Sequence, residues 1–294
     1  MRRLLPIALL VLAAGCLREP DPITFVEPSL AVHGLVLAGG TQVRVSLMRA
    51  FTGEELPTDA TVKLESGGTT ITLAPVADPA DPGCYGTSGL PTAVVARSCY
   101  GAVLPQPVAA GTTWQLRATV SSGEQVTGTT RVPSPPTVVR PAARERVPFT
   151  ASGDGYATPA QIPVEWQTAG APRVEVGLGE GRPYRGGQLL QDARCILIVD
   201  HGAAAVNQPS GSRFLVLQDV YCFPTTPQPQ PQPVAWDSVA TDVVVTAYDS
   251  AYAQFALHGE SFSRGSASAA LQGAYGVFGS AATTRREIVI VAQQ

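Results

Sequence analysis

Three histidines and a few scattered acids are the side chains with which this chain could perform acid–base chemistry. His201 follows Asp200 at the end of an apolar run and precedes Gly202, so we expect this pair at the mouth of a loop. A Ser–His–Asp triad needs an acid that orients the histidine, whereas adjacent strand residues point to opposite faces of a sheet. His33 is expected to be a half-buried strand residue, and His258 an ordinary loop histidine. No Gly-x-Ser-x-Gly sequence is present, so we expect no catalytic residues and no enzyme.

The acids give no stronger prediction of catalysis or of metal binding. Glu54–Glu55, Glu165, Glu175 and Glu180 could form a carboxylate pair, but only if two of them met about 5 to 10 Å apart in a cleft. Asp78–Gly83 holds two acids at close spacing, as calcium loops do, but it lacks the further ligands of an EF-hand. Its prolines are typical of a turn. We therefore expect no metal and no cofactor.

Four of the five cysteines are expected to form two disulfides. They are Cys84, Cys99, Cys195 and Cys222, and an even number in an exported chain indicates disulfides. Three pairings are possible, and we favour Cys84–Cys99 with Cys195–Cys222, because each bond would then stabilise one structural unit. A zinc site is the alternative, but no Cys-x-x-Cys pair occurs.

The fifth cysteine, Cys16, ends a short leader. Arg2 and Arg3 precede an apolar run from Leu4 to Ala14, and Gly15 stands directly before Cys16. This order is typical of a secretory signal peptide. An 11-residue apolar run is too short to span a membrane, since a spanning helix needs about 20 residues.

The residues before Cys16 resemble a bacterial lipobox, which implies cleavage after residue 15 and attachment of lipid to Cys16. Leu17 follows where aspartate would favour the inner membrane, so a lipid-anchored position at the outer membrane is expected. The alternative is an ordinary secretory signal cleaved after Ala14 or Gly15.

Length and composition suggest two domains of ordinary size without affinity for nucleic acid. The chain has 294 residues, is 45% hydrophobic and carries a net charge of −3. Nucleic-acid binding needs a basic surface that replaces counterions. The 29 glycines and 26 prolines indicate many turns.

Alternating apolar residues predict an all-β fold made of two immunoglobulin-like or Greek-key β-sandwiches. After a Pro-rich tether over residues 16–28, the first sandwich is expected over residues 29–132, with Trp114 in its core. A Pro-rich linker is expected over 133–145. The strands expected in the first unit are Leu30–Leu37, Gln42–Arg49, Thr61–Glu65, Thr69–Leu73, Ser98–Leu104, Thr113–Val120 and Gln125–Val132.

The second sandwich is expected over residues 146–294, with a loose similarity to fibronectin type III domains. One short helix is predicted at Asp249–Leu257, capped by Asp249 or Ser250. The Pro-Gln repeat at 226–233 and the segment Ser261–Gly276 are expected to be loops. The expected strands are Ile162–Trp166, Arg173–Leu178, Arg194–Val199, Arg213–Val220, Val239–Tyr248 and Ile288–Val291, of which the third and fourth are the most apolar and are expected to be buried.

Several tyrosines could bind a sugar or a protein. Exposed aromatic side chains are common anchors of binding surfaces. The alternative is that they only cover the ends of the sandwiches. The residues concerned are Tyr85, Tyr100, Tyr156 and Tyr184.

Taken together, these segments resemble the lipoprotein family called domain of unknown function 4249. The resemblance implies a two-domain, β-rich envelope lipoprotein that accompanies a TonB-dependent outer-membrane transporter, and it brings no site residues. It rests on the lipobox and on Leu30–Leu35, Val43–Ala50, Asp59–Val62, Asp249–Tyr252 and Gly276–Ser280.

The expected function is therefore that of a lipid-anchored binding or accessory protein whose ligand-binding residues are unknown. An outer-membrane β-barrel transporter is the expected partner. The alternatives are a stand-alone glycan- or peptide-binding surface lipoprotein or adhesin, and a cryptic hydrolase.

Overall fold

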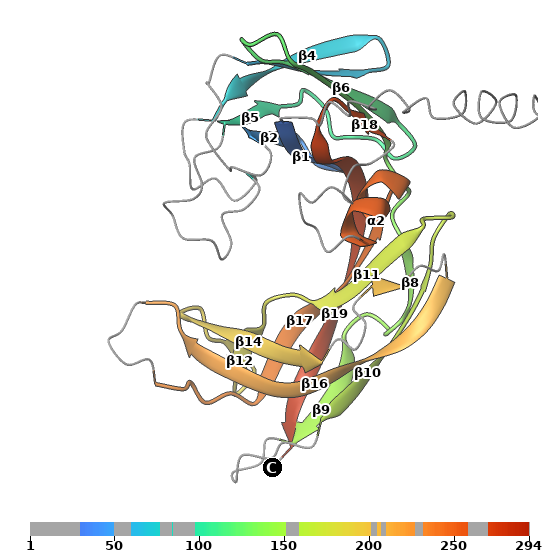
Figure 1. Cartoon of the computed structure of the whole chain (residues 1–294). Coiled ribbons are helices and arrows are strands. Elements are labelled where there is room, and N and C mark those ends of the chain that lie inside the picture. The colour runs from blue at the N-terminus through green and yellow to red at the C-terminus, as the bar shows by residue number, and fades with distance from the viewer. Residues whose placement is uncertain are drawn as a thin grey trace, which may run out of the picture.

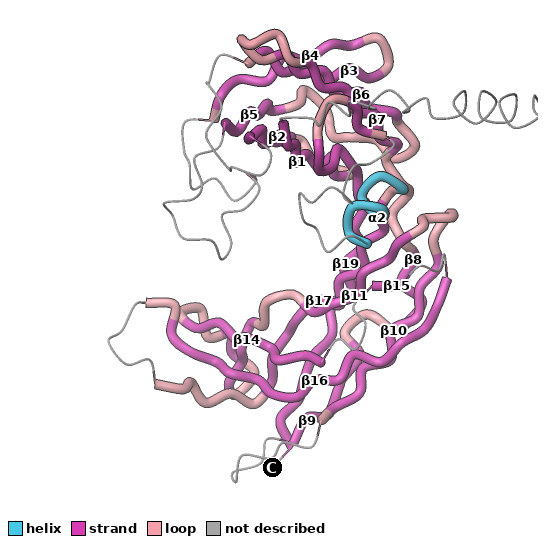
Figure 2. The backbone as a smooth tube through the Cα atoms, in the orientation of Figure 1, coloured by secondary structure: helices cyan, strands magenta, loops and turns pink. Residues whose placement is uncertain are grey.

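β-Strands make up most of the structure, as the alternating sequence predicts. The structure is a computed structural model, and it describes residues 30–49, 60–76, 84, 98–150, 159–200, 205–206, 210–226, 232–257 and 270–293. The fold is all-β and sandwich-like, and one short helix, α2 (Ser250–Leu257), occurs in the described ranges (Figure 2). Figure 1 shows two β-rich bodies that meet near α2.

The first sandwich follows the predicted strands closely. The order of its strands is β1-β2-β5-β4-β3-β6-β7, and β6 and β7 alternate strictly between buried and exposed residues. Trp114 lies in the core, as predicted. The bounds are β1 Leu30–Leu37, β2 Gln42–Arg49, β3 Thr61–Ser66, β4 Thr69–Pro75, β5 Ser98–Val103, β6 Thr113–Thr119 and β7 Gln125–Arg131.

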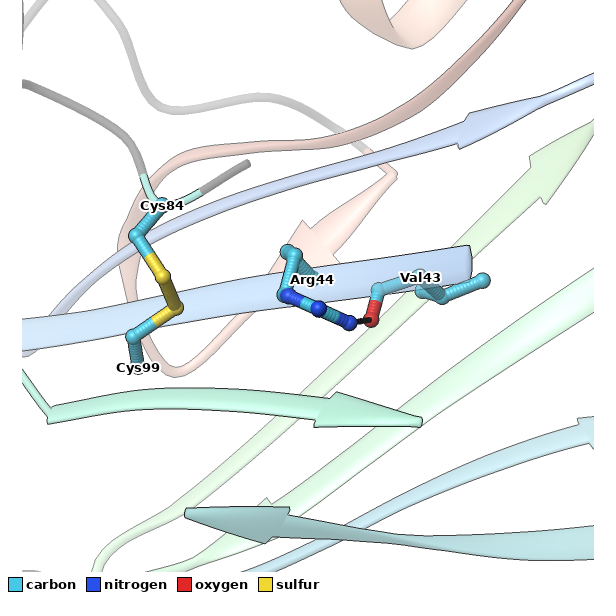
Figure 3. Close-up of a disulfide and its surroundings, with 4 residues drawn as sticks. All are labelled: Val43, Arg44, Cys84 and Cys99. Carbon is cyan, nitrogen blue, oxygen red and sulfur yellow. Dashed lines mark hydrogen bonds between the residues drawn. A yellow bond between two sulfur atoms is a disulfide. The ribbon is translucent and has the colours of Figure 1, made fainter. Parts of the chain in front are cut away.

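Two local features of this sandwich are a glycine turn and a disulfide. Gly67 and Gly68 make the turn between β3 and β4 with positive φ angles of 56° and 81°, which glycine adopts without steric cost. A disulfide joins Cys84 to Cys99 of β5, and beside it the Arg44 guanidinium donates to the Val43 carbonyl at 3.1 Å (Figure 3).

The second sandwich packs a four-stranded sheet of order β14-β16-β10-β8 against a sheet built around β17. The second disulfide of the chain lies in this sandwich and joins Cys195 of β14 to Cys222, the directly opposite residue of β16. Both bonds follow the favoured pairing. The bounds are β8 Thr137–Arg140, β9 Glu145–Thr150, β10 Ala160–Gln167, β11 Arg173–Leu178, β12 Arg182–Arg185, β13 Gln188–Leu189, β14 Ala193–Asp200, β15 Ala205–Val206, β16 Ser210–Pro224 and β17 Ser238–Tyr248.

The last strand, β19 (Tyr275–Gln293), belongs to both sandwiches (Figure 1). Its first part pairs in parallel with β1 of the first sandwich, and its second part pairs with β17 of the second. The short β18 (Leu271–Gln272) pairs with β7. The prediction that residues 146–294 form only the second sandwich is therefore wrong for residues 271–281. These residues complete the core of the first sandwich with Leu271, Ala274 and Phe278. Part of the loop predicted over 261–276 is also strand.

The segment 133–145 is not a free linker. Thr137–Arg140 forms the edge strand β8 beside β10, and Glu145 begins β9, which pairs with β19. Edge positions tolerate the flanking prolines, since a proline there removes no ladder hydrogen bond that the sheet needs.

The outer face of the four-stranded sheet differs from the prediction. Arg194–Val199 and Arg213–Val220 were expected to be buried, but only alternate residues point into the core. Ile196, Ile198, Phe214 and Tyr221 are 42 to 57% exposed. The apolar composition of these two strands predicts that they pack against a core. It does not show whether the sheet is covered on one face or on both.

Candidate functional site

A cleft of about 830 Å³ lies where the two sandwiches meet, and residues of both line it. Three segments form most of its walls: residues 129–134 at the end of β7, the β10–β11 turn at 169–172, and the junction of β17 with α2. Its volume falls within the range usual for ligand sites.

Asp249 is the acid of this junction. It lies directly after β17, is 8% exposed, and caps α2 by accepting the Tyr252 amide at Oδ1, 3.0 Å away. Oδ1 also accepts the Ser280 amide at 3.2 Å. The Thr130 hydroxyl donates to Oδ2 at 2.6 Å and lies 2.6 Å from Ser280 Oγ as well. One carboxylate thus joins β7, α2 and β19.

The surroundings of Asp249 indicate a positioning role and not a reactive one. Burial raises the pKa of its carboxyl, while hydrogen bonds from Thr130 and from the Tyr252, Ser280 and Ala251 amides act in the opposite direction. Both oxygens of the carboxylate therefore accept hydrogen bonds from the protein. Asp249 therefore fixes α2 and β19 beside the cleft.

Aromatic contacts hold the other side of the junction. Tyr248 stacks on Tyr252 with ring centroids 4.4 Å apart and planes at 14°. The Tyr248 hydroxyl donates to Glu175 of β11 at 2.8 Å, and Arg173 donates to the same carboxylate. Polar residues of the cleft include Thr129, Arg131 and Ser134. The rest of its lining is largely made of small residues and prolines: Gly111, Val132, Pro133, Ala169, Ala171, Pro172 and Ala270.

The comparisons with known proteins leave the family open. No family model matches the chain, and no curated protein matches it. Among solved structures, the FN1–FN3 domains of chicken CNTN1 align at 11% identity and a TM-score of 0.17, covering 91% of this chain and 65% of that one. The chain thus spans slightly less than two thirds of that structure.

Two further structures align equally distantly. The BSP domain of a biofilm-associated protein aligns at 8% identity and a TM-score of 0.18, covering 90% of this chain and 62% of that one. A marsupial T cell receptor aligns at 7% and 0.17, covering 76% and 84%. Superpositions this loose carry no argument about function.

The structure keeps the predicted acids apart. Glu165 of β10 lies near Arg140 of β8. Glu175 accepts hydrogen bonds from Arg173 and Tyr248, and Glu180 is exposed after the end of β11. Within the described ranges no group of three or more His, Cys, Asp or Glu residues could hold a metal ion. In those same ranges no helix is long and apolar enough to cross a membrane.

The candidate tyrosines fare differently from one another. Tyr100 is fully buried in the first core, and its hydroxyl accepts the Ala60 amide at 3.2 Å, so its prediction as a surface anchor is wrong. Tyr184 is half-buried on β12. The remaining candidates lie outside the described residues: Cys16, Glu54, Glu55, Asp78–Gly83, Tyr85, Tyr156, His201, His258 and the centre of the Pro-Gln repeat.

His33 is half-buried on β1, as predicted, and packs edge-to-face on Phe255 of α2 at 6.0 Å between ring centroids. Burial lowers its pKa from 6.5 to about 4. Because the folded state favours neutral His33, the contribution of this residue to stability is complete above pH 6.5 and is lost as the pH falls towards 4. We expect this one group to cost about 2 kcal/mol of unfolding free energy between pH 7.5 and 5. Urea unfolding of wild type and His33→Asn at both pH values checks this, and the same pH dependence in both proteins would contradict it.

Proposed function

We propose that this chain is a lipid-anchored binding protein of the cell envelope, and that it acts as an accessory to a TonB-dependent outer-membrane transporter. The observation that carries the proposal concerns the cysteines. One disulfide joins Cys84 to Cys99 and a second joins Cys195 to Cys222. Cys16 therefore has no other cysteine of the chain with which to pair. Disulfides fit an oxidising compartment outside the cytoplasm, where lipid on Cys16 would hold the protein at the membrane.

The junction cleft supports a role in binding. It is large enough for a peptide segment or a small ligand, and its best-placed acid, Asp249, is occupied by structural hydrogen bonds. A loop of the transporter is the proposed occupant. Capture of a glycan or peptide without any transporter is the second candidate, and the volume of the cleft favours it equally.

Purification from native outer membranes tests the proposal. We expect a β-barrel transporter to co-purify in equal amount with the tagged full-length protein, and Cys16→Ser to abolish both lipid incorporation and this association. Ser134→Trp, which fills the cleft from an exposed wall position, is expected to reduce co-purification at least tenfold. Thr72→Trp on exposed β4 is the matched control.

The outcomes separate the two parts of the proposal. Lipid on Cys16 without a co-purifying transporter would support the lipid anchor and contradict the proposed transporter partner. A screen of glycans and peptides by thermal shift would follow. Absence of lipid on Cys16 would contradict the anchor itself.

A further inference from the structure

The outer face of the four-stranded sheet β14-β16-β10-β8 presents two exposed aromatic rings in line along one strand. Phe214 and Tyr221 of β16 are 57% and 52% exposed, and their neighbours Leu215 and Cys222 point into the core. A β-bulge opposite Ile198 adds one residue to β16 between the two rings, which keeps them on the same face. The two side chains leave the strand about 20 Å apart, at about 3.3 Å for each position with the bulged residue left out.

The surface between and beside these rings is apolar as well. Tyr221 lies opposite Ile196 of β14, and Phe214 lies opposite Pro163 of β10. Ile198, which is 42% exposed, points outward between them. The strands of this sheet carry five of the eight large hydrophobic side chains that are exposed in the described ranges. Exposed apolar patches of this kind mark interaction sites.

The charged side chains of this face favour a partner without charge. Both described cations are engaged by neighbours, since Arg140 lies 3.8 Å from Glu165, and Arg194 lies 5.1 Å above the Phe223 ring. The other charged residues of the face are acids: Asp200 and Asp219. These acids would repel phosphate-rich lipid or another polyanion, and a membrane interior would have to desolvate their carboxylates at high cost.

Uncharged sugars combine apolar ring faces with polar rims, and the face offers groups for both. The C–H groups of a sugar face are attracted to the negative π-face of an aromatic ring. Gln161 of β10 and Gln218 of β16 are exposed between the two aromatic rings, and their amides can bind the hydroxyls at the rim of a sugar. Two stacking positions thus flank a stretch with hydrogen-bonding groups.

We infer that this face binds a linear, uncharged polysaccharide, which lies along β16 and stacks on Phe214 and Tyr221. A single sugar would reach only one of two rings that are about 20 Å apart, so a chain of sugars is needed to contact both. The site shares no residue with the junction cleft, and it does not depend on the proposed transporter.

Affinity electrophoresis tests the inference. The purified protein is run through gels that contain hydroxyethyl cellulose, glucomannan, mixed-linkage β-glucan or pullulan, with the acidic polymer polygalacturonate for comparison. At least one uncharged polymer is expected to slow the protein, and polygalacturonate is expected to have no effect. Tyr221→Ala and Phe214→Ala are each expected to raise the dissociation constant at least tenfold. Tyr221→Trp keeps a stacking ring and is expected to keep the affinity.

Tyr221→Leu separates ring stacking from apolar contact. Leucine keeps apolar surface but has no π-face, so this variant is expected to bind as weakly as Tyr221→Ala. Val103→Ala changes another exposed apolar residue, on β5 of the first sandwich, and is expected to leave binding unchanged. Ser134→Trp in the junction cleft is also expected to leave it unchanged, so the sugar site and the transporter contact fail or succeed separately.

The inference would be overturned if no uncharged polysaccharide slowed the protein, or if Tyr221→Leu bound with full affinity. Loss of sugar binding in Ser134→Trp but not in Tyr221→Ala would also overturn it, and would place the sugar in the junction cleft. Binding to phosphatidylethanolamine vesicles that Tyr221→Ala abolishes, without any polysaccharide binding, would identify a lipid surface instead.

Discussion

Phe278→Ala is expected to lower the free energy of unfolding by about 4 kcal/mol, the largest effect among the substitutions considered. Phe278 is 1% exposed and lies in the first part of β19, yet it fills the core of the first sandwich. Its ring packs against Gly34 of β1, and its Cβ lies against Gly128 of β7. Removal of a fully buried phenylalanine side chain costs about 3 to 5 kcal/mol, because the cavity collapses only in part.

Chemical denaturation with hydrogen exchange measures this effect and shows how far it spreads. We expect the amides of β6 in the first sandwich and of β17 in the second to lose protection together, because β19 pairs within both. Phe214→Ala, on an exposed face, is the control and is expected to cost less than 1 kcal/mol. Loss of protection in β6 alone would show that the sandwiches unfold independently.

Asp249→Ala is expected to lower the free energy of unfolding by about 3 kcal/mol. The change removes the N-cap of α2, worth about 1 kcal/mol. It also leaves the Thr130 hydroxyl and the Ser280 amide buried with fewer acceptors, which adds about 2 kcal/mol. Urea unfolding monitored by circular dichroism gives the difference directly.

Asp249→Asn separates shape from charge. Asparagine also caps helices, so this variant is expected to keep most of the stability. Because burial raises the pKa of Asp249, the folded state favours the protonated carboxyl, and that contribution is lost as the pH rises through the raised pKa. The stability of Asp249→Asn relative to wild type is therefore expected to increase from pH 4 to pH 7. A constant difference would mean that the carboxyl does not titrate in this range.

Local sequence pattern predicted what depends on neighbours along the chain. The alternation of Gln42–Arg49 and the glycines after Ser66 placed strands and a turn within about one residue. The spacing of Tyr252 and Phe255 placed α2, and Asp249 caps it as predicted. These features arise from period, capping and turn geometry, which a single segment contains.

The features that the sequence did not reveal depend on contacts between residues that are far apart in the chain. Nothing local to Tyr275–Ala281 indicates parallel pairing with β1 more than 240 residues earlier. The role of Asp249 as the link between β7 and β19 needs Thr130 and Ser280, which only the fold brings near it. The exposed Ile196 and Phe214 have the composition of a buried strand, so only the structure shows that one face is uncovered.

The distance in sequence between β1 and β19, more than 240 residues, affects the order of assembly. Residues 30–131 supply most strands of the first sandwich, but their core lacks Leu271 and Phe278 until synthesis has passed residue 278. Contacts so distant in sequence form late and slowly. We therefore expect the first sandwich to keep apolar surface uncovered until residues 271–281 reach it.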